Sequence, residues 1–227
     1  MFGLGGRKLK VVAFDVIGTV FPLEPLRPEI VKLGFPPSGL EGWFAASLRD
    51  AFALAVTGDF KPFAVVLEEA LKSVAAEQGL EVSSHDRASL IGSMKELKAR
   101  SGAQEAFTRL KDRGVEVIAL SNGSTILTRH LLDKAGLSGL VEHVVSVDDV
   151  KLSKPRPEVY LHAAKVAKVH PGELALVAAH AWDVHGARAA GLATGYLSAD
   201  RPFSEAMATP DVSAGTLPEI VAALLEQ

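Results

Sequence analysis

The chain has 227 residues, of which 48% are hydrophobic and 22% charged, a composition typical of a globular protein rather than a disordered one. It contains no cysteine, which excludes disulfides and thiol nucleophiles. The formal net charge is -3, with no basic stripe and no block of like charges, so we expect neither nucleic acid nor a membrane surface as a partner.

The first apolar run of the chain starts after Lys10 and is interrupted by Asp15. A membrane span needs about 20 apolar residues, so this run is too short for one. No small-residue cleavage site follows a clean apolar stretch, and a signal peptide is therefore not expected. The sequence predicts a cytoplasmic protein.

Five short apolar runs predict buried strands, at residues 11–14, 115–120, 143–147, 174–178 and, more weakly, 193–197. Helical patterns lie between the predicted strands, at residues 104–113, 125–135, 157–169 and 181–190. An amphipathic helix is predicted after the last strand, at residues 217–225. Strands that alternate with helices indicate βαβ units. We therefore predict an α/β protein with a Rossmann-like, doubly wound parallel sheet.

Residues 23–98 follow a different pattern, because they contain no convincing strand. Helices are predicted at residues 40–56, 62–77 and 85–98, with turns at 36–37 and 57–59. An all-helical insert after the first strand is best explained as a cap over the sheet. We predict a core domain of residues 1–22 and 99–227, and a helical cap domain of residues 23–98.

Polar residues fall at or just beyond the carboxyl ends of the predicted strands, where a doubly wound sheet binds its ligands. They are Asp15, Ser121, Asn122, Lys154 and Asp183. A carboxylate at the end of an apolar strand is suited to nucleophilic attack. Lys154 would keep it ionised and neutralise developing negative charge. A turn carboxylate and a solvated lysine remain the alternatives for these two residues.

The other polar positions also leave alternatives open. Gly18 allows the backbone to turn, so that nearby amides can face an anion. Ser121 and Asn122 can donate hydrogen bonds to an oxyanion, a carboxylate or a phosphate, or they can cap a helix. His180 is either a general base or a packed, hydrogen-bonded imidazole. Asp183 can orient a water molecule or the neighbouring cation, or it can favour the start of a helix.

Four segments, taken in chain order, resemble the four motifs of the haloacid dehalogenase superfamily. They are residues 14–20 (FDVIGTV), residues 120–123 (LSNG), Lys154-Pro155 with Tyr160, and residues 178–183 (AAHAWD). Each motif is weak alone. Together with a helical insert after the first motif, they identify the chain as similar to this superfamily over nearly its whole length.

Most phosphatases of the superfamily carry a second aspartate two residues after the nucleophile, which protonates the leaving group. Ile17 occupies that position here, and the loss of a general acid typically costs about 10²–10⁴ in rate. Phosphatases also tend to carry two acidic residues in the fourth motif, whereas only Asp183 is present, so an oxygen-rich Mg²⁺ site is poorly supplied. We expect no metal and no cofactor, with Mg²⁺ relevant only to a phosphatase.

The departures point to the L-2-haloacid dehalogenase branch, which works without metal. This resemblance implies that the aspartate displaces halide from a short 2-haloacid and that water then hydrolyses the aspartyl ester. Halide leaves as a stable anion, so no proton donor is needed at position 17. The implied catalytic residues are Asp15, Lys154, Asp183, Ser121 and Thr19, and the implied substrate-binding residues are Ile17, Asn122, Phe44, Tyr160, His180 and Trp182.

Three positions differ from that branch and bear on the substrate. The dehalogenases have a cap arginine that contacts the halide and the substrate, and alignment places Phe44 there, with Arg27 and Arg49 as candidate substitutes. The serine of the fourth motif is Ala178 in this chain, and the asparagine is His180.

Two other functions remain open at this level. One is a phosphatase or phosphonate hydrolase, for which Lys61 or Lys72 would have to serve as a Schiff-base lysine. The other is a non-catalytic, ligand-binding or partner-binding relative, in which Ile17, Phe44 and Ala178 mark decayed chemistry. The aromatic-rich cap helix would line either the active site for a small-molecule substrate or the interface of a homodimer.

Overall fold

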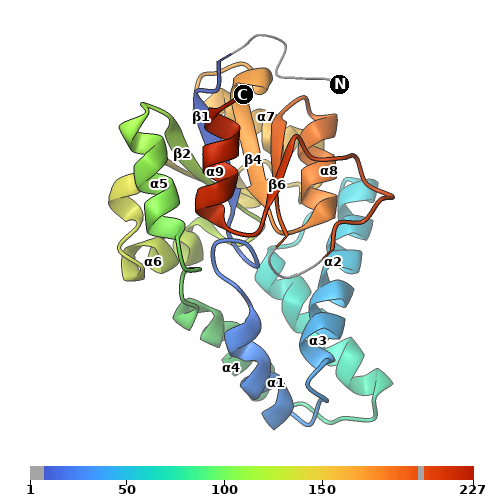
Figure 1. Ribbon diagram of the computed structural model, residues 1–227. Coiled ribbons are helices and arrows are strands. Elements are labelled where there is room, and N and C mark those ends of the chain that lie inside the picture. Colours follow the sequence, from blue (N-terminus) through green and yellow to red (C-terminus); the bar gives the residue numbers. More distant parts are fainter. Residues whose placement is uncertain (1–7, 199–201) are drawn as a thin grey trace.

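The computed structural model describes residues 8–198 and 202–227, and its centre is a parallel six-stranded sheet (Figure 1). The strand order is β3-β2-β1-β4-β5-β6. The strands are β1 (Val11–Asp15), β2 (Glu116–Ser121), β3 (His143–Ser146), β4 (Leu174–Ala178), β5 (Ala193–Leu197) and β6 (Val212–Ala214). The five predicted strands are confirmed, and β6 is an edge strand that the sequence pattern did not indicate.

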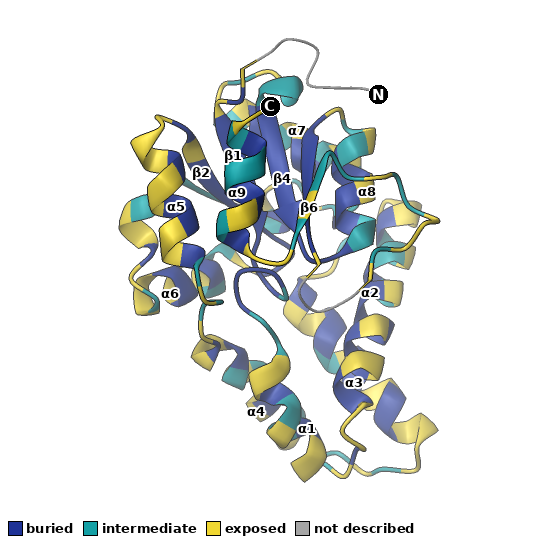
Figure 2. Ribbon diagram, in the orientation of Figure 1, coloured by how far each residue is buried: buried dark blue, intermediate teal, exposed yellow. Residues whose placement is uncertain are grey.

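Helices cover both faces of the sheet, because the apolar side chains of the central strand point alternately to either side. Val12 and Phe14 of β1 join one apolar cluster, and Val11 and Ala13 join the other. The first cluster is covered by α5 (Ala103–Asp112), α6 (Thr125–Lys134) and α9 (Leu217–Leu225), and the second by α7 (Pro157–Val166) and α8 (Ala181–Ala189). Figure 2 shows the buried faces of these helices turned toward the sheet. The predicted doubly wound architecture is thus confirmed.

Between residues 24 and 96 the structure contains helices joined by turns and loops, and it contains no strand. The α-helices are α1 (Arg27–Lys32), α2 (Gly39–Thr57), α3 (Phe63–Glu77) and α4 (Ser84–Ser93), and a 3-10 turn follows at Met94–Glu96. They form the lower lobe in Figure 1. Trp43 of α2 is fully buried, and its indole nitrogen donates a 2.8 Å hydrogen bond to the carbonyl of Leu67 in α3. Three of these helices match the predicted cap helices, whereas α1 was missed.

The helical lobe and its two connecting segments make contacts near the strand ends. Where the chain returns from the lobe, the backbone N–H of Arg100 donates to the carbonyl of Val20 at 2.7 Å. The Arg100 guanidinium donates to the carbonyl of Thr19 at 3.0 Å. In addition, Lys151 lies 5.1 Å from the ring centre of Phe60. Arg100 thus joins the two segments that connect the lobe to the sheet, and Lys151 contacts the lobe itself.

The described residues include no helix that is both long and apolar enough to cross a bilayer.

Gly186 in α8 allows this helix to approach the loop that carries Lys154. A Cβ atom at this position would lie 2.6 Å from Cβ of Pro155 and 2.7 Å from the hydroxyl oxygen of Tyr160. We predict that Gly186→Ala lowers the free energy of unfolding by about 1–3 kcal/mol, the usual cost of overpacking. Urea denaturation measures this.

Gly92 in α4 is the matched control, because a Cβ atom there would meet nothing within 4 Å. Gly92→Ala should raise stability by up to about 1 kcal/mol through helix propensity. Equal effects of the two substitutions would contradict the role assigned to Gly186.

Candidate active site

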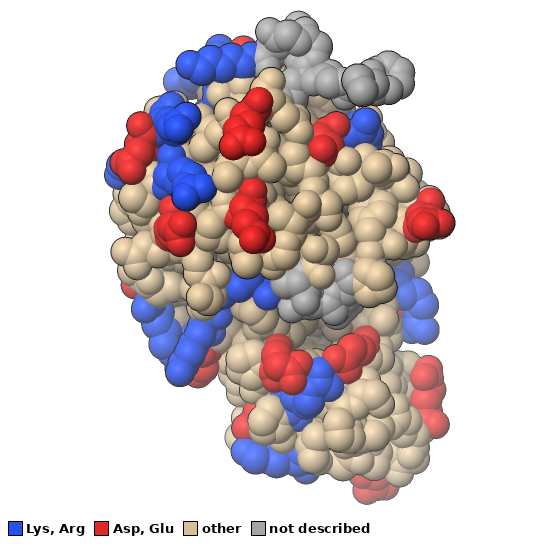
Figure 3. Space-filling view, viewed as in Figure 1, with Lys and Arg blue, Asp and Glu red and all other residues tan. Residues whose placement is uncertain are grey.

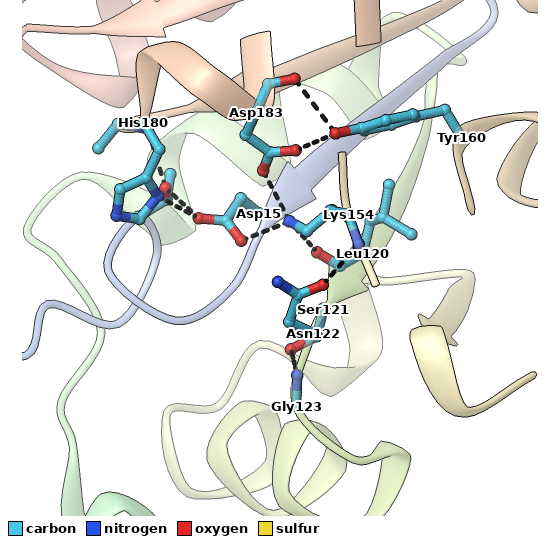
Figure 4. Close-up of polar contacts among 11 residues, drawn as sticks. Asp15, Leu120, Ser121, Asn122, Gly123, Lys154, Tyr160, His180 and Asp183 are labelled. Atoms are coloured by element: carbon cyan, nitrogen blue, oxygen red, sulfur yellow. Dashed lines mark hydrogen bonds and ion pairs between the residues drawn. The ribbon is translucent and has the colours of Figure 1, made fainter. Parts of the chain in front are cut away.

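The site lies where the strand order reverses, between β1 and β4, at the carboxyl edge of the sheet. Asp15 is the last residue of β1, and Ser121 is the last residue of β2. Asp183 lies in the first turn of α8, which follows β4. Figure 4 shows the carboxylates of Asp15 and Asp183 directed at Lys154, which comes from the loop after β3, with Ser121 below them. The polar residues that the sequence predicted to meet therefore share one site.

The ammonium group of Lys154 bridges two carboxylates. Its Nζ lies 2.7 Å from Oδ1 of Asp15 and 2.6 Å from Oδ2 of Asp183. The side chains of Lys154 and Asp183 are fully buried, and that of Asp15 is 5% exposed. The Nζ atom also donates to the carbonyl of Leu120 at 3.3 Å. A charged group removed from water needs such partners, since burial of an unpaired charge is costly.

The charges of this cluster shift the pKa values of its members in opposite directions. Burial raises the pKa of Asp15. The Lys154 charge and then the hydrogen bond with His180 lower this pKa by more than burial raises it, so it lies well below the usual range. For Asp183, burial and the Asp15 charge outweigh Lys154, and the pKa is raised. Burial lowers the pKa of Lys154, yet the two carboxylates raise it above its usual value. Asp15 is therefore ionised near neutral pH.

Thr19 and Tyr160 orient the two carboxylates. The hydroxyl of Thr19 donates to Oδ2 of Asp15 at 2.6 Å and accepts from the backbone N–H of Ala179 at 2.9 Å. The Tyr160 hydroxyl donates to Oδ1 of Asp183 at 2.6 Å. Burial and then the Asp183 charge raise the Tyr160 pKa well above its usual value, so Tyr160 stays a neutral donor. Each carboxylate thus accepts a hydrogen bond from a hydroxyl group in addition to the one from Lys154.

Ser121 and Asn122 lie beneath the Lys154 loop (Figure 4). The hydroxyl oxygen of Ser121 accepts from the N–H of Gly123 at 2.9 Å, and Oδ1 of Asn122 accepts from the N–H of Lys154 at 3.1 Å. Neither residue caps α6, because the cap is Ser124, whose hydroxyl accepts from the N–H of Leu127 at 3.2 Å. The capping alternative for Ser121 and Asn122 is therefore wrong.

The imidazole of His180 lies on the opposite side of Asp15 from Lys154. Its Nδ1 is 3.1 Å from Oδ2 of Asp15. The His180 ring packs against Trp182, with ring centres 5.4 Å apart, and against Phe44 of α2 at 5.8 Å. Phe44 of α2 thus lies directly against this imidazole, and its role in substrate binding stays a prediction.

Gly18 provides space for this imidazole and does not present its amide to a ligand. Its φ of +91° fits the turn expected after Asp15. However, its N–H donates to the carbonyl of Phe21 at 2.8 Å, so it is not free to face an anion. The amide of Gly18 itself is therefore engaged, and the expectation that nearby amides face an anion stays a prediction.

The two candidate substitutes for the cap arginine have other partners. Arg27 forms ion pairs with Glu24 and Glu41 at 2.6 and 2.5 Å. Arg49 pairs with Asp50 at 2.9 Å, and its side chain is 64% exposed. Neither guanidinium is recorded in contact with the Asp15 cluster, so among the described residues the cation next to Asp15 is Lys154.

Two cavities flank His180 and Phe44. One has a volume of about 480 Å³ and is also lined by Gly18 and Glu41, and the other, of about 560 Å³, is also lined by Trp182 and Phe52. Asp15 lines neither cavity and lies behind the imidazole of His180. The aromatic pair formed by His180 and Phe44 thus lies between Asp15 and these cavities.

Two residues that shape the site were missed in the sequence. Arg100 supports Thr19 through the carbonyl contact described above, and Gly186 admits Pro155 and Tyr160 to the Lys154 loop. A lone arginine and a helical glycine carry no signal of such contacts in one sequence, because both depend on long-range packing. No group of three or more His, Cys, Asp or Glu side chains suited to a metal occurs among the described residues.

A family model for the haloacid dehalogenase-like hydrolases matches residues 9–191. The chain belongs to this family. The match spans β1 through α8 and therefore all four motif segments of this haloacid dehalogenase-like hydrolase. The family membership predicted from those segments is confirmed.

Individual relatives with similar sequences are 2-haloacid dehalogenases. The (S)-2-haloacid dehalogenase of Pseudomonas sp. (strain YL) is 28% identical over 217 residues, which cover 94% of this chain and 93% of the relative. The (S)-2-haloacid dehalogenase 2 of Pseudomonas sp. (strain CBS-3) is 27% identical, with 90% and 91% covered. The crystal structure of the L-2-haloacid dehalogenase RSc1362 is 25% identical, with a TM-score of 0.89 and coverage of 97% and 100%.

We predict that Lys154→Met destabilises this hydrolase by about 3–5 kcal/mol at pH 7.5, because two buried carboxylates lose their shared cation. In the wild type, Asp15 has a depressed pKa and contributes stability above about pH 4, whereas Lys154 has a raised pKa and contributes below about pH 10. The substitution therefore costs most between these limits. In the variant, burial raises the carboxylate pKa values, so the deficit should shrink at pH 5, as measured by urea denaturation.

Lys151→Met is the control for this measurement, since Lys151 is exposed and lies on the same loop. It should change stability by less than about 1 kcal/mol at either pH. A deficit for Lys154→Met that is no larger than this, or that is equal at both pH values, would contradict the paired-charge account.

Proposed function

We propose that the protein is an (S)-2-haloacid dehalogenase-like hydrolase that acts on short 2-haloacids, with Asp15 as the nucleophile. The observation that carries this proposal is the buried Asp15–Lys154 ion pair with Ile17 two residues further on. Such a site offers an ionised nucleophile without a proton donor for the leaving group. The dehalogenase names of the relatives support the same activity.

In the first step, Asp15 attacks the halogen-bearing carbon and the halide departs with the bonding electrons. Burial leaves the Asp15 carboxylate poorly hydrated, while Lys154 keeps it ionised. Halide is the anion of a strong acid, so the aliphatic side chain of Ile17, 6% exposed, suffices where a phosphatase needs an acid. Phosphoryl transfer to an alkoxide leaving group would lack that proton. The geometry therefore favours dehalogenation over the phosphatase alternative.

The carboxylate of the substrate needs donors of its own. The hydroxyl of Ser121 and the amide nitrogen of Asn122 are the candidates, since both residues are buried beside Lys154. We also propose Tyr160 and Trp182 as binding residues. Trp182 lies with its ring centre 5.8 Å from the Lys154 Nζ, and Tyr160 acts through Asp183.

In the second step, water hydrolyses the ester formed on Asp15. Asp183 is the proposed acceptor for the water's proton, because its pKa is raised and it shares Lys154 with the nucleophile. No step of this sequence needs a metal ion or a cofactor, and we propose that none takes part.

The remaining predictions rest on the sequence. We propose residues 23–98 as the cap domain, a small-molecule substrate, a cytoplasmic location and, as an open prediction, a homodimer. Among the described residues on the face drawn in Figure 3, acidic and basic side chains are mixed rather than gathered into a basic stripe. This distribution supports the expectation that nucleic acid is not a partner.

The test is release of chloride from (S)-2-chloropropionate, measured with purified wild-type protein and with Asp15→Asn. We expect chloride release by the wild type and a loss of at least about 10³-fold in the variant, since an amide is not a nucleophile here. The variant should stay folded, because Lys154 keeps Asp183 as its partner.

Phosphate release from p-nitrophenyl phosphate with Mg²⁺ is measured in parallel. Chloride release that survives in Asp15→Asn would refute the nucleophile. Phosphate release without chloride release from any short 2-haloacid would replace the proposal with the phosphatase alternative.

A further inference from the structure

The two oxygens of the Asp15 carboxylate have different partners (Figure 4). Oδ1 accepts one hydrogen bond, from Nζ of Lys154 at 2.7 Å. Oδ2 accepts from the hydroxyl of Thr19 at 2.6 Å and faces Nδ1 of His180 at 3.1 Å. An ionised carboxylate is an acceptor only, so Nδ1 of His180 must carry the proton and donate it.

The His180 ring is fixed in this position by its surroundings. It lies over Gly18, where a Cβ atom would come within 2.6 Å of Cε1 and 2.9 Å of Nε2. Trp182 stacks on it with an interplanar angle of 27°, and His180 itself is 6% exposed. A donor held in this way does not need to reorganise during the reaction, which is the condition for effective electrostatic stabilisation.

This asymmetry separates the roles of the two oxygens. Oδ1, with a single partner, keeps the more available lone pair and is the attacking atom. Oδ2 then becomes the carbonyl oxygen of the ester, with Thr19 and His180 already directed at it. We propose that the Nδ1–H of His180 and the hydroxyl of Thr19 form the oxyanion hole for hydrolysis of the Asp15 ester. This inference rests on the proposed function.

Bonds and charges are conserved in both steps of the reaction. The bond from Oδ1 to the substrate carbon forms while the carbon–halogen bond breaks, and halide takes the electron pair. Water then bonds to Cγ of Asp15, and the carbonyl π electrons move to Oδ2, where His180 and Thr19 meet the new charge. The Cγ–Oδ1 bond breaks and the 2-hydroxy acid leaves with Oδ1. One proton of the water reaches that oxygen through Asp183, the other goes to solvent, and Asp15 is a carboxylate again.

The oxyanion role differs from that of a general base in what it predicts. Negative charge on Oδ2 decreases when the ester forms and increases when water adds, so a donor there assists hydrolysis and not attack. Loss of one oxyanion donor typically costs about 10²–10³ in rate. His180 is therefore expected to set the rate of the second step alone. Since Nδ1 already carries a proton, that nitrogen is not free to accept one from water.

The experiment is rapid-quench measurement of chloride release from (S)-2-chloropropionate, with mass spectrometry of the Asp15 peptide. His180→Phe keeps an aromatic ring but removes the donor. We expect a burst of one chloride per active site at close to the wild-type rate, followed by a steady rate about 10²–10³-fold lower. The quenched Asp15 peptide should carry the ester. His180→Asn keeps a donor and should stay within about tenfold of the wild-type steady rate.

His185→Asn is the matched control, because His185 is exposed on the same helix and accepts a hydrogen bond from the N–H of Ala208. It should behave like the wild type. His180→Leu serves as a second donor-free variant if His180→Phe does not fold.

A burst slowed as much as the steady rate, without ester on Asp15, would overturn the inference while leaving the proposed function intact. Chloride release by none of the proteins, the wild type included, would overturn the proposed function and this inference with it.

Discussion

The ion pair between Lys154 and the two carboxylates of Asp15 and Asp183 is the interaction on which the site depends. Three charged groups are buried together, and each is tolerable only because the others are present. The pKa of Asp15 is lowered and that of Asp183 is raised, so Asp15 holds its negative charge more firmly than Asp183. In the proposed mechanism, Asp15 is thereby the nucleophile at neutral pH, and Asp183 is the group better suited to take a proton.

The sheet topology makes this cluster possible. Parallel strands bring their carboxyl ends to one edge, and the reversal of strand order between β1 and β4 opens a place for ligands there. Asp15 ends β1, and α8 starts directly after β4 and brings Asp183 and His180 toward it. The helical lobe then closes this edge with Phe44. The fold supplies a buried site, while its residues select the chemistry.

Most of the architecture could be predicted from the sequence because apolar runs and glycine stops are local signals. Edge strand β6 was missed because its three residues are partly exposed and pair only through long-range hydrogen bonds with β5. Helix α1, six residues long, was also too short to show a period. The site residues were predictable from motifs at strand ends. The contact between His180 and Asp15 was not, because the rotation of one ring depends on Gly18, Trp182 and Phe44, which come from separate segments.

In the proposed mechanism, water attacks the ester on Asp15 and not the substrate carbon. A single turnover in H₂¹⁸O, with enzyme in excess over (S)-2-chloropropionate, tests this most directly. We expect ¹⁸O in the carboxylate of Asp15, detected by mass spectrometry of its peptide, and an unlabelled hydroxy acid. Label in the hydroxy acid after the first turnover, with Asp15 unlabelled, would contradict it.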